Sequence, residues 1–177
     1  NHNIPPQAFT ELNQNLYHVG SVHDPCPAVI SAKELDKRDW LVTSVNETLR
    51  VKGVDVIKHT IDQALTLSAS NVVIHPGRIT GDHSMDAQLR DLYTSGKKGT
   101  AEYEDLKTKL IQDRHERAKP HLESLIKSIR ELIDFSRLSG ISLGLENRFH
   151  YYELPIFEEM EIILDTFTEN WVGWHLD

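Results

Sequence analysis

The sequence predicts an α/β fold built around a parallel sheet. Four short apolar segments, typical of buried strands, alternate with longer segments in which apolar residues recur at helical spacing. Strands that alternate with helices pair in parallel through right-handed crossovers. Both a doubly wound sheet and a (β/α)8 barrel satisfy this order, and the periodicity alone does not separate them.

The four predicted strands are short and sharply terminated. The first covers 16–23 and stops before Asp24-Pro25-Cys26-Pro27, because proline cannot continue a central strand. The second is the β-branched run 71–75, which Pro76-Gly77 ends. The third and fourth cover 141–146 and 171–177.

Helical patterns fill the intervals between these strands. The first covers 46–68, with Asn46 or Ser44 as its N-cap. Two further patterns are broken by the segment 95–100, and a more regular one starts beyond Pro120 and stops at a glycine. The last helix follows a proline and carries its apolar face on Phe157, Met160, Ile163, Leu164 and Phe167.

Composition is that of an ordinary globular protein and predicts one domain over 1–177. Hydrophobic residues make up 39% and charged residues 26%, and no run approaches the roughly 18 apolar residues of a membrane helix. The first residues lack the features of a signal peptide and Cys26 is the single cysteine, so we expect a cytoplasmic protein without a membrane partner. The net charge of −8 disfavours nucleic acid as a partner.

Each predicted strand ends on a residue that can bind a metal ion: His23, His75, Glu146 and Asp177. In parallel α/β folds the C-terminal edge of the sheet is where sites are built, so these four side chains should converge. Two imidazoles and two carboxylates suit a divalent ion, with Zn²⁺ or Mn²⁺ favoured and Co²⁺, Fe²⁺ or Mg²⁺ compatible. Each residue alone has an ordinary structural alternative, but four at equivalent positions favour a shared site.

Two neighbouring residues are candidate substrate-binding groups. Arg148 follows Glu146 by two positions and could hold an anionic or hydroxyl-rich substrate, or form a surface salt bridge. His175 precedes Asp177 by two positions and therefore shares its strand face, where it could orient a ligand or serve as a hydrogen-bonded core residue.

Four segments carry a resemblance to a known family: SVHDPCP, VVIHPG, LGLENR and GWHLD. In this order, over about 16–177, they resemble the xylose isomerase-like TIM-barrel superfamily, which includes sugar isomerases and epimerases, inosose dehydratase-type enzymes and endonuclease IV. The resemblance implies an eight-stranded barrel with a divalent-metal centre, in which His23, His75, Glu146 and Asp177 are ligands. It also implies that the four visible strands are the third to sixth, so that the domain 1–177 is a partial barrel of about four central βα units, truncated at both ends.

The resemblance implies a metal-dependent sugar or cyclitol isomerase or epimerase. The ion would polarise a substrate carbonyl, and Glu146 would serve as both ligand and catalytic proton-transfer group at the adjacent carbon. The expected partner is a small-molecule carbohydrate, and a homo-oligomer is compatible with the pattern.

Two alternatives stay open at this stage. The histidine pair also suits an endonuclease IV-like phosphodiester hydrolase acting on abasic DNA. The excess of acidic residues counts against this function, and the loops after His23 and His75 lack the aromatic and basic residues that could insert into a DNA duplex. A non-catalytic barrel that binds a metal ion or a sugar is the other alternative.

Overall fold

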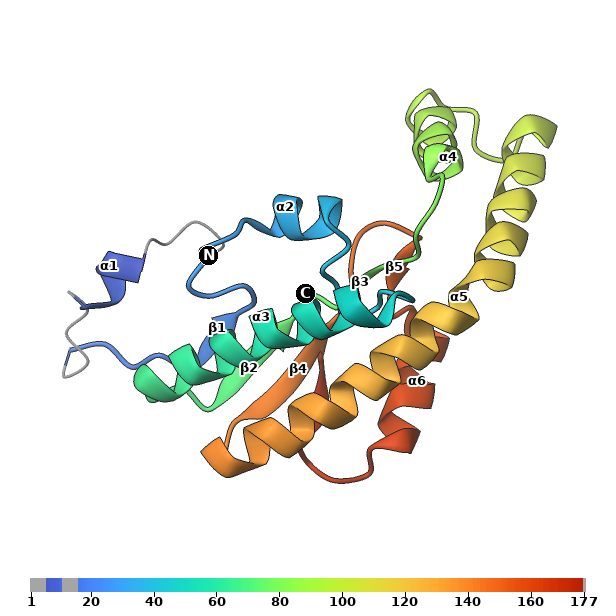
Figure 1. Ribbon diagram of the computed structural model, residues 1–177. Helices are drawn as coiled ribbons and strands as arrows, with labels where there is room; N and C mark the ends of the chain where they lie inside the picture. The colour runs from blue at the N-terminus through green and yellow to red at the C-terminus, as the bar shows by residue number, and fades with distance from the viewer. Residues whose placement is uncertain (1–5, 11–15, 177) are drawn as a thin grey trace.

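The computed structural model describes residues 6–10 and 16–176. Its centre is a parallel four-stranded sheet in the order β1-β2-β4-β6, formed by Ser21–His23, Asn71–Ile74, Ser142–Glu146 and Val172–His175 (Figure 1). Residues pair in continuous register, with Val22 opposite Val72, Val72 opposite Leu143 and Leu143 opposite Val172. The predicted α/β class with four central strands is confirmed.

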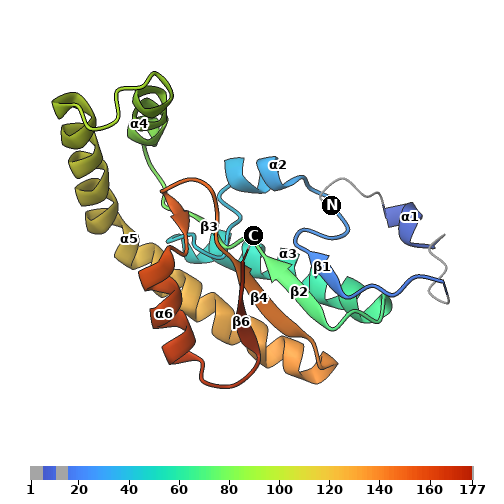
Figure 2. The same ribbon diagram turned by 180° about the vertical axis from the view of Figure 1, so that it is seen from behind.

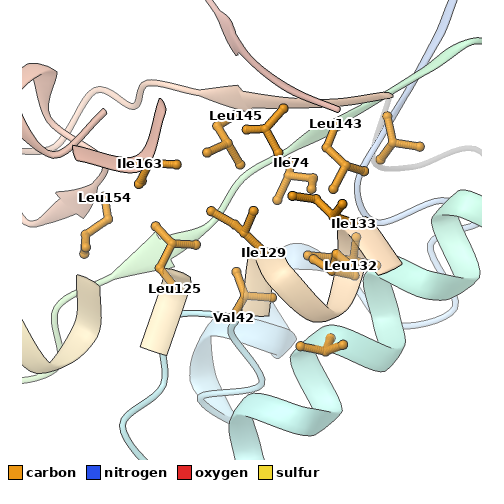
Figure 3. Packing of buried hydrophobic residues seen from close by; sticks show 14 of the residues in the cluster. Val42, Ile74, Leu125, Ile129, Leu132, Ile133, Leu143, Leu145, Leu154 and Ile163 are labelled. Atoms are coloured by element: carbon orange, nitrogen blue, oxygen red, sulfur yellow. The ribbon is translucent and has the colours of Figure 1, made fainter. Parts of the chain in front are cut away.

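Two long helices, α3 (Glu47–Thr66) and α5 (Ala101–Ser136), cover one face of the sheet. In Figure 2 the strands lie in front of both helices, and Figure 3 shows Ile129 and Leu132 of α5 in the same apolar cluster as Ile74 and Leu143 of the sheet. All four of these side chains are buried. Burial of each such side chain stabilises the fold by roughly 1.5–3 kcal/mol relative to exposure, so the apolar runs are the parts that hold helix to sheet.

The sheet is strongly curved, as a barrel wall is. His23 on β1 and His175 on β6 have ring centroids 5.7 Å apart, although β2 and β4 lie between their strands. Three strand spacings in a flat sheet would separate the two strands by about 14 Å. The hollow inside this curve, about 650 Å³, is lined by Val73, Gly144 and His175 among others.

Most predicted boundaries hold within a few residues, with two corrections. The first strand is shorter than the predicted 16–23, because only Ser21–His23 pairs with β2. The helical patterns on either side of Pro120 form one helix of 36 residues, whose buried face continues from Leu110 to Leu125 across the proline. That continuous face compensates for the single backbone hydrogen bond that proline removes.

The helix ends follow local chemistry. Asn46 is the N-cap of α3, since its side-chain oxygen accepts from the backbone N–H groups of Thr48 and Leu49. Gly140, with φ of 67°, ends the short 3-10 turn η1 (Arg137–Ser139) that follows α5. The helix α6 (Phe157–Thr166) follows Pro155 as predicted.

Several short elements have no counterpart in the sequence prediction. They are the helices α1 (Pro6–Thr10) and α2 (Ala32–Lys37) and the antiparallel pair β3 (Gly77–Arg78) and β5 (Glu153–Leu154). The helix α4 (Ser84–Thr94) and the first half of α5 form a hairpin that projects away from the sheet (Figure 1).

Within the described ranges no helix is long and apolar enough to span a membrane.

Candidate metal centre

Three of the four predicted ligands meet at the C-terminal edge of the sheet. His23 and Glu146 are the last residues of β1 and β4, and His75 directly follows β2. Because Ile74 pairs with Leu145, the next residues along, His75 and Glu146, are also neighbours across the two strands. The shared direction of the strands therefore delivers the three side chains to one place.

The three donor groups form a compact cluster. The His75 Nε2 atom lies 2.9 Å from Oε2 of Glu146, and Nδ1 of His23 lies 3.8 Å from the same oxygen. One ligand atom from each residue falls within 4.8 Å of the other two, and the part of the chain that the structure describes contains no other such trio of His, Cys, Asp or Glu.

The electrostatics favour an ionised carboxylate. Glu146 is only 3% exposed. Burial by itself raises its pKa, but the hydrogen bond from Arg148 and the interaction with His75 outweigh that effect and hold the pKa below its usual range. An ionised carboxylate beside two imidazoles is a donor set typical of a divalent ion.

The geometry fits such an ion. Zinc binds imidazole nitrogen and carboxylate oxygen at about 2.0–2.2 Å, so two donors on one ion lie no more than about 4.4 Å apart. The donor atoms of His23, His75 and Glu146 need only small side-chain adjustments to meet that limit. All three project from strand ends, which are rigid supports for a site.

The other three predicted site residues, Asp177, His175 and Arg148, are not among these three donors. Asp177 lies outside the described residues. His175 is opposite Glu146 in the β4–β6 register, with its ring near that of His23, but it is not part of the trio of donors. Arg148 donates from Nη1 to Oε1 of Glu146 at 2.8 Å and lines a cavity of about 170 Å³ that also borders His75.

Two acidic residues of this region escaped the sequence prediction. Glu153 lines the same cavity, and its Oε1 lies 3.6 Å from Nε of Arg148. Asp24, directly after His23, is buried, which raises its pKa to about 7, while a hydrogen bond from Thr60 opposes the rise. The only sequence signal for Asp24 was its position beside His23; Glu153 lies on a two-residue strand that has no detectable pattern.

A buried ion pair between α5 and α6 fixes the loop between Glu146 and α6. Arg114 of α5 is 3% exposed and donates to both carboxylate oxygens of Glu159 on α6, at 2.7 and 2.9 Å. The same guanidinium donates to the carbonyl oxygens of Tyr151 and Glu153, at 2.6 and 3.2 Å. The loop that carries Arg148 is thereby fixed to two helices.

Comparison with known proteins supports the fold. No family model matches the sequence, and no curated protein matches it. Among solved structures, a D-tagatose 3-epimerase-like protein is 22% identical, with a TM-score of 0.61 over 97% of this chain and 49% of that one. A D-psicose 3-epimerase is 14% identical, with a TM-score of 0.56 over 99% of this chain and 58% of its own.

A D-allulose 3-epimerase from Methylomonas sp. gives a similar result, with 15% identity and a TM-score of 0.56 over 91% of this chain and 52% of that one. The chain therefore spans about half the length of the solved structures it matches. These matches confirm the predicted fold, a partial barrel of four parallel strands.

Proposed function

We propose that this chain is the metal-binding portion of a sugar or cyclitol isomerase or epimerase. The observation that carries the proposal is the meeting of His23, His75 and Glu146 at the C-terminal edge of a curved parallel sheet. This is the edge at which TIM barrels place their active sites. The structurally similar proteins share the fold, and the 3-epimerase activity in their names supports the choice of reaction class.

In this proposal His23, His75 and Glu146 hold a divalent ion, Zn²⁺ or Mn²⁺ before Co²⁺, Fe²⁺ or Mg²⁺, and Asp177 completes the set. The ion supplies Lewis-acid polarisation of a substrate carbonyl. Glu146, ionised at neutral pH, ligates the ion and moves a proton at the carbon next to that carbonyl. Inversion at a carbon needs a second proton-transfer group on the opposite face, which we expect from a glutamate elsewhere in the barrel.

Substrate contacts are assigned to the side chains that border the cluster. Arg148 lines the cavity beside His75, and His175 lines the hollow inside the sheet. Both can donate hydrogen bonds to hydroxyl groups, which suits a small carbohydrate. His23 and His75 are ligands rather than bases in this scheme, because a coordinated imidazole has its lone pair committed.

The test is solvent-proton exchange. The metal-loaded full-length protein is incubated in D2O with a panel of ketoses and keto-cyclitols, and nuclear magnetic resonance follows deuterium incorporation next to the carbonyl. We expect exchange with at least one compound, its loss in His75→Ala, and its retention in His115→Ala, an exposed histidine of α5. Absence of exchange across the panel with Zn²⁺, Mn²⁺ and Co²⁺ would contradict the proposal.

A second candidate is hydrolysis of abasic DNA, as in endonuclease IV. The observation in its favour is the close pairing of two imidazoles, those of His23 and His75, whose ring centroids are 5.8 Å apart. The net charge of −8 weighs against it, because DNA binding depends on neutralising phosphates. Cleavage of an abasic-site oligonucleotide by the metal-loaded protein, lost in His23→Ala, would reverse our preference.

A further inference from the structure

The two carboxylate oxygens of Glu146 have different neighbours. Oε1 accepts a hydrogen bond from Nη1 of Arg148 at 2.8 Å. Oε2 lies 2.9 Å from Nε2 of His75 and 3.8 Å from Nδ1 of His23. One oxygen is therefore engaged by the guanidinium, and the other faces the imidazoles.

We infer that Arg148 is a positioning residue for the metal ligand Glu146: it holds Oε1, so that Oε2 is the oxygen presented between His23 and His75. The inference rests on the proposed function, since it concerns how this chain presents a ligand to an ion. Positioning is a different role from substrate binding, because a residue that only binds substrate need not contact the metal ligand Glu146.

Arg148 is itself held in place. Its Nε lies 3.6 Å from Oε1 of Glu153, whose Oε2 accepts from the backbone N–H of His150 at 2.8 Å. The backbone of Glu153 pairs with Arg78 between β3 and β5, and its carbonyl oxygen accepts from Arg114. The guanidinium thus spans two carboxylates, one of which is tied to the rest of the fold.

The chemistry of the side chain explains why arginine suits this position. A guanidinium has donors on separate edges of a rigid plane, so Nη1 can reach Glu146 while Nε faces Glu153. A lysine ammonium is a single point on a flexible stem and cannot reproduce that span. Groups that orient a metal ligand typically change metal affinity about 10- to 100-fold when removed.

The experiment measures metal binding rather than activity. Dissociation constants for Mn²⁺ and Co²⁺, and the visible spectrum of the Co²⁺ form, are compared for the full-length wild type, Arg148→Gln, Arg148→Lys and Glu153→Gln. We expect about 10- to 100-fold weaker binding in Arg148→Gln with altered Co²⁺ bands. Arg148→Lys and Glu153→Gln should also bind the metal ions more weakly than the wild type, but by a smaller factor. These two variants keep the test valid if Arg148→Gln folds poorly.

Arg90→Gln is the matched control. Arg90 is similar to Arg148 in side-chain exposure, at 33% against 34%, and donates to the carbonyl of Phe149 in the same loop, but its acidic partner is Asp86 rather than Glu146. It should bind metal like the wild type. If Arg148→Gln kept wild-type metal affinity and the wild-type Co²⁺ spectrum, or if Arg90→Gln lost as much metal affinity as Arg148→Gln, the inference alone would be overturned. A wild type that binds no divalent ion would overturn both the proposed function and the inference.

Discussion

Arg114 on α5 and Glu159 on α6 form a bidentate ion pair that is almost completely buried, with both carboxylate oxygens within 2.9 Å of the guanidinium. The pair also fixes the loop after β4, because Arg114 donates to two of its carbonyl oxygens and Glu159 accepts from the backbone N–H of Ile156 at 2.9 Å. Stability and the placement of Arg148 therefore depend on the same two side chains.

Replacing Arg114 alone should be strongly destabilising. Arg114→Met leaves the Glu159 carboxylate buried without its partner, and breaking a buried pair in this way typically costs about 3–5 kcal/mol. The double variant Arg114→Met with Glu159→Leu should recover part of the loss, because no unpaired buried charge remains. Urea unfolding measures both, with exposed Arg38→Met as a control expected to change stability by less than about 1 kcal/mol. Equal losses in Arg114→Met and Arg38→Met would refute this account.

Gly53 should not tolerate alanine, although alanine usually favours a helix interior. A Cβ at this position of α3 would lie 2.7 Å from the backbone carbonyl carbon of Leu41 and 2.9 Å from the amide nitrogen of Val42. Backbone atoms cannot move aside as a flexible side chain can, so we expect Gly53→Ala to lower the free energy of unfolding by about 1–3 kcal/mol. Gly20→Ala, where a Cβ meets nothing within 4 Å, is the control and should be nearly neutral in the same urea titration.

The contribution of His121 to stability should fall as the pH falls below about 6.5. Burial lowers the pKa of this histidine, and the hydrogen bond to the Thr43 carbonyl oxygen and the charge of Asp39 only partly oppose that effect. In the unfolded chain histidine titrates near a pKa of about 6.5. Below that pH the unfolded state takes up a proton that the folded state accepts only at lower pH, so the free energy of unfolding decreases until the folded pKa is passed.

His121→Gln should therefore make the slope of the free energy of unfolding against pH less positive between about pH 7 and 5, while the raised pKa of Asp24 contributes a slope of opposite sign in both proteins. His83 remains, and burial lowers its pKa as well. Urea titrations at several pH values give the slopes, and exposed His115→Gln serves for comparison. If the slope in His121→Gln equalled that of the wild type, the buried neutral histidine would not be a source of the pH dependence.

Metal ions should stabilise the fold through the cluster at the strand ends. A ligand that binds only the folded state raises the free energy of unfolding by about 2.7 kcal/mol at roughly 100 times its dissociation constant. We expect Zn²⁺ or Mn²⁺ to raise the melting temperature of the wild type, a chelator to reverse the increase, and His75→Ala to remove it. A metal-induced increase of equal size in His75→Ala would place the binding elsewhere.

Much of the site could be predicted from sequence because strand ends are local features. The β-branched run before His75 and the apolar alternation before Glu146 mark buried strands, and parallel pairing then brings their ends together. Glu153 could not be found in this way, since β5 is two residues long and gains its position from pairing with β3. The role of Arg114 was equally hidden, because it lies 45 residues from Glu159.

The sequence by itself therefore determined the α/β class, the order of strands and helices, and the three donors that meet at one edge. These depend on the periodicity of apolar residues and on where prolines and glycines interrupt it. Only the tertiary structure decided the curvature that brings His23 to His175, the continuity of α5 through Pro120, and the division of the Glu146 oxygens between Arg148 and the imidazoles. Those features arise from packing between segments far apart in the chain, which local patterns do not encode.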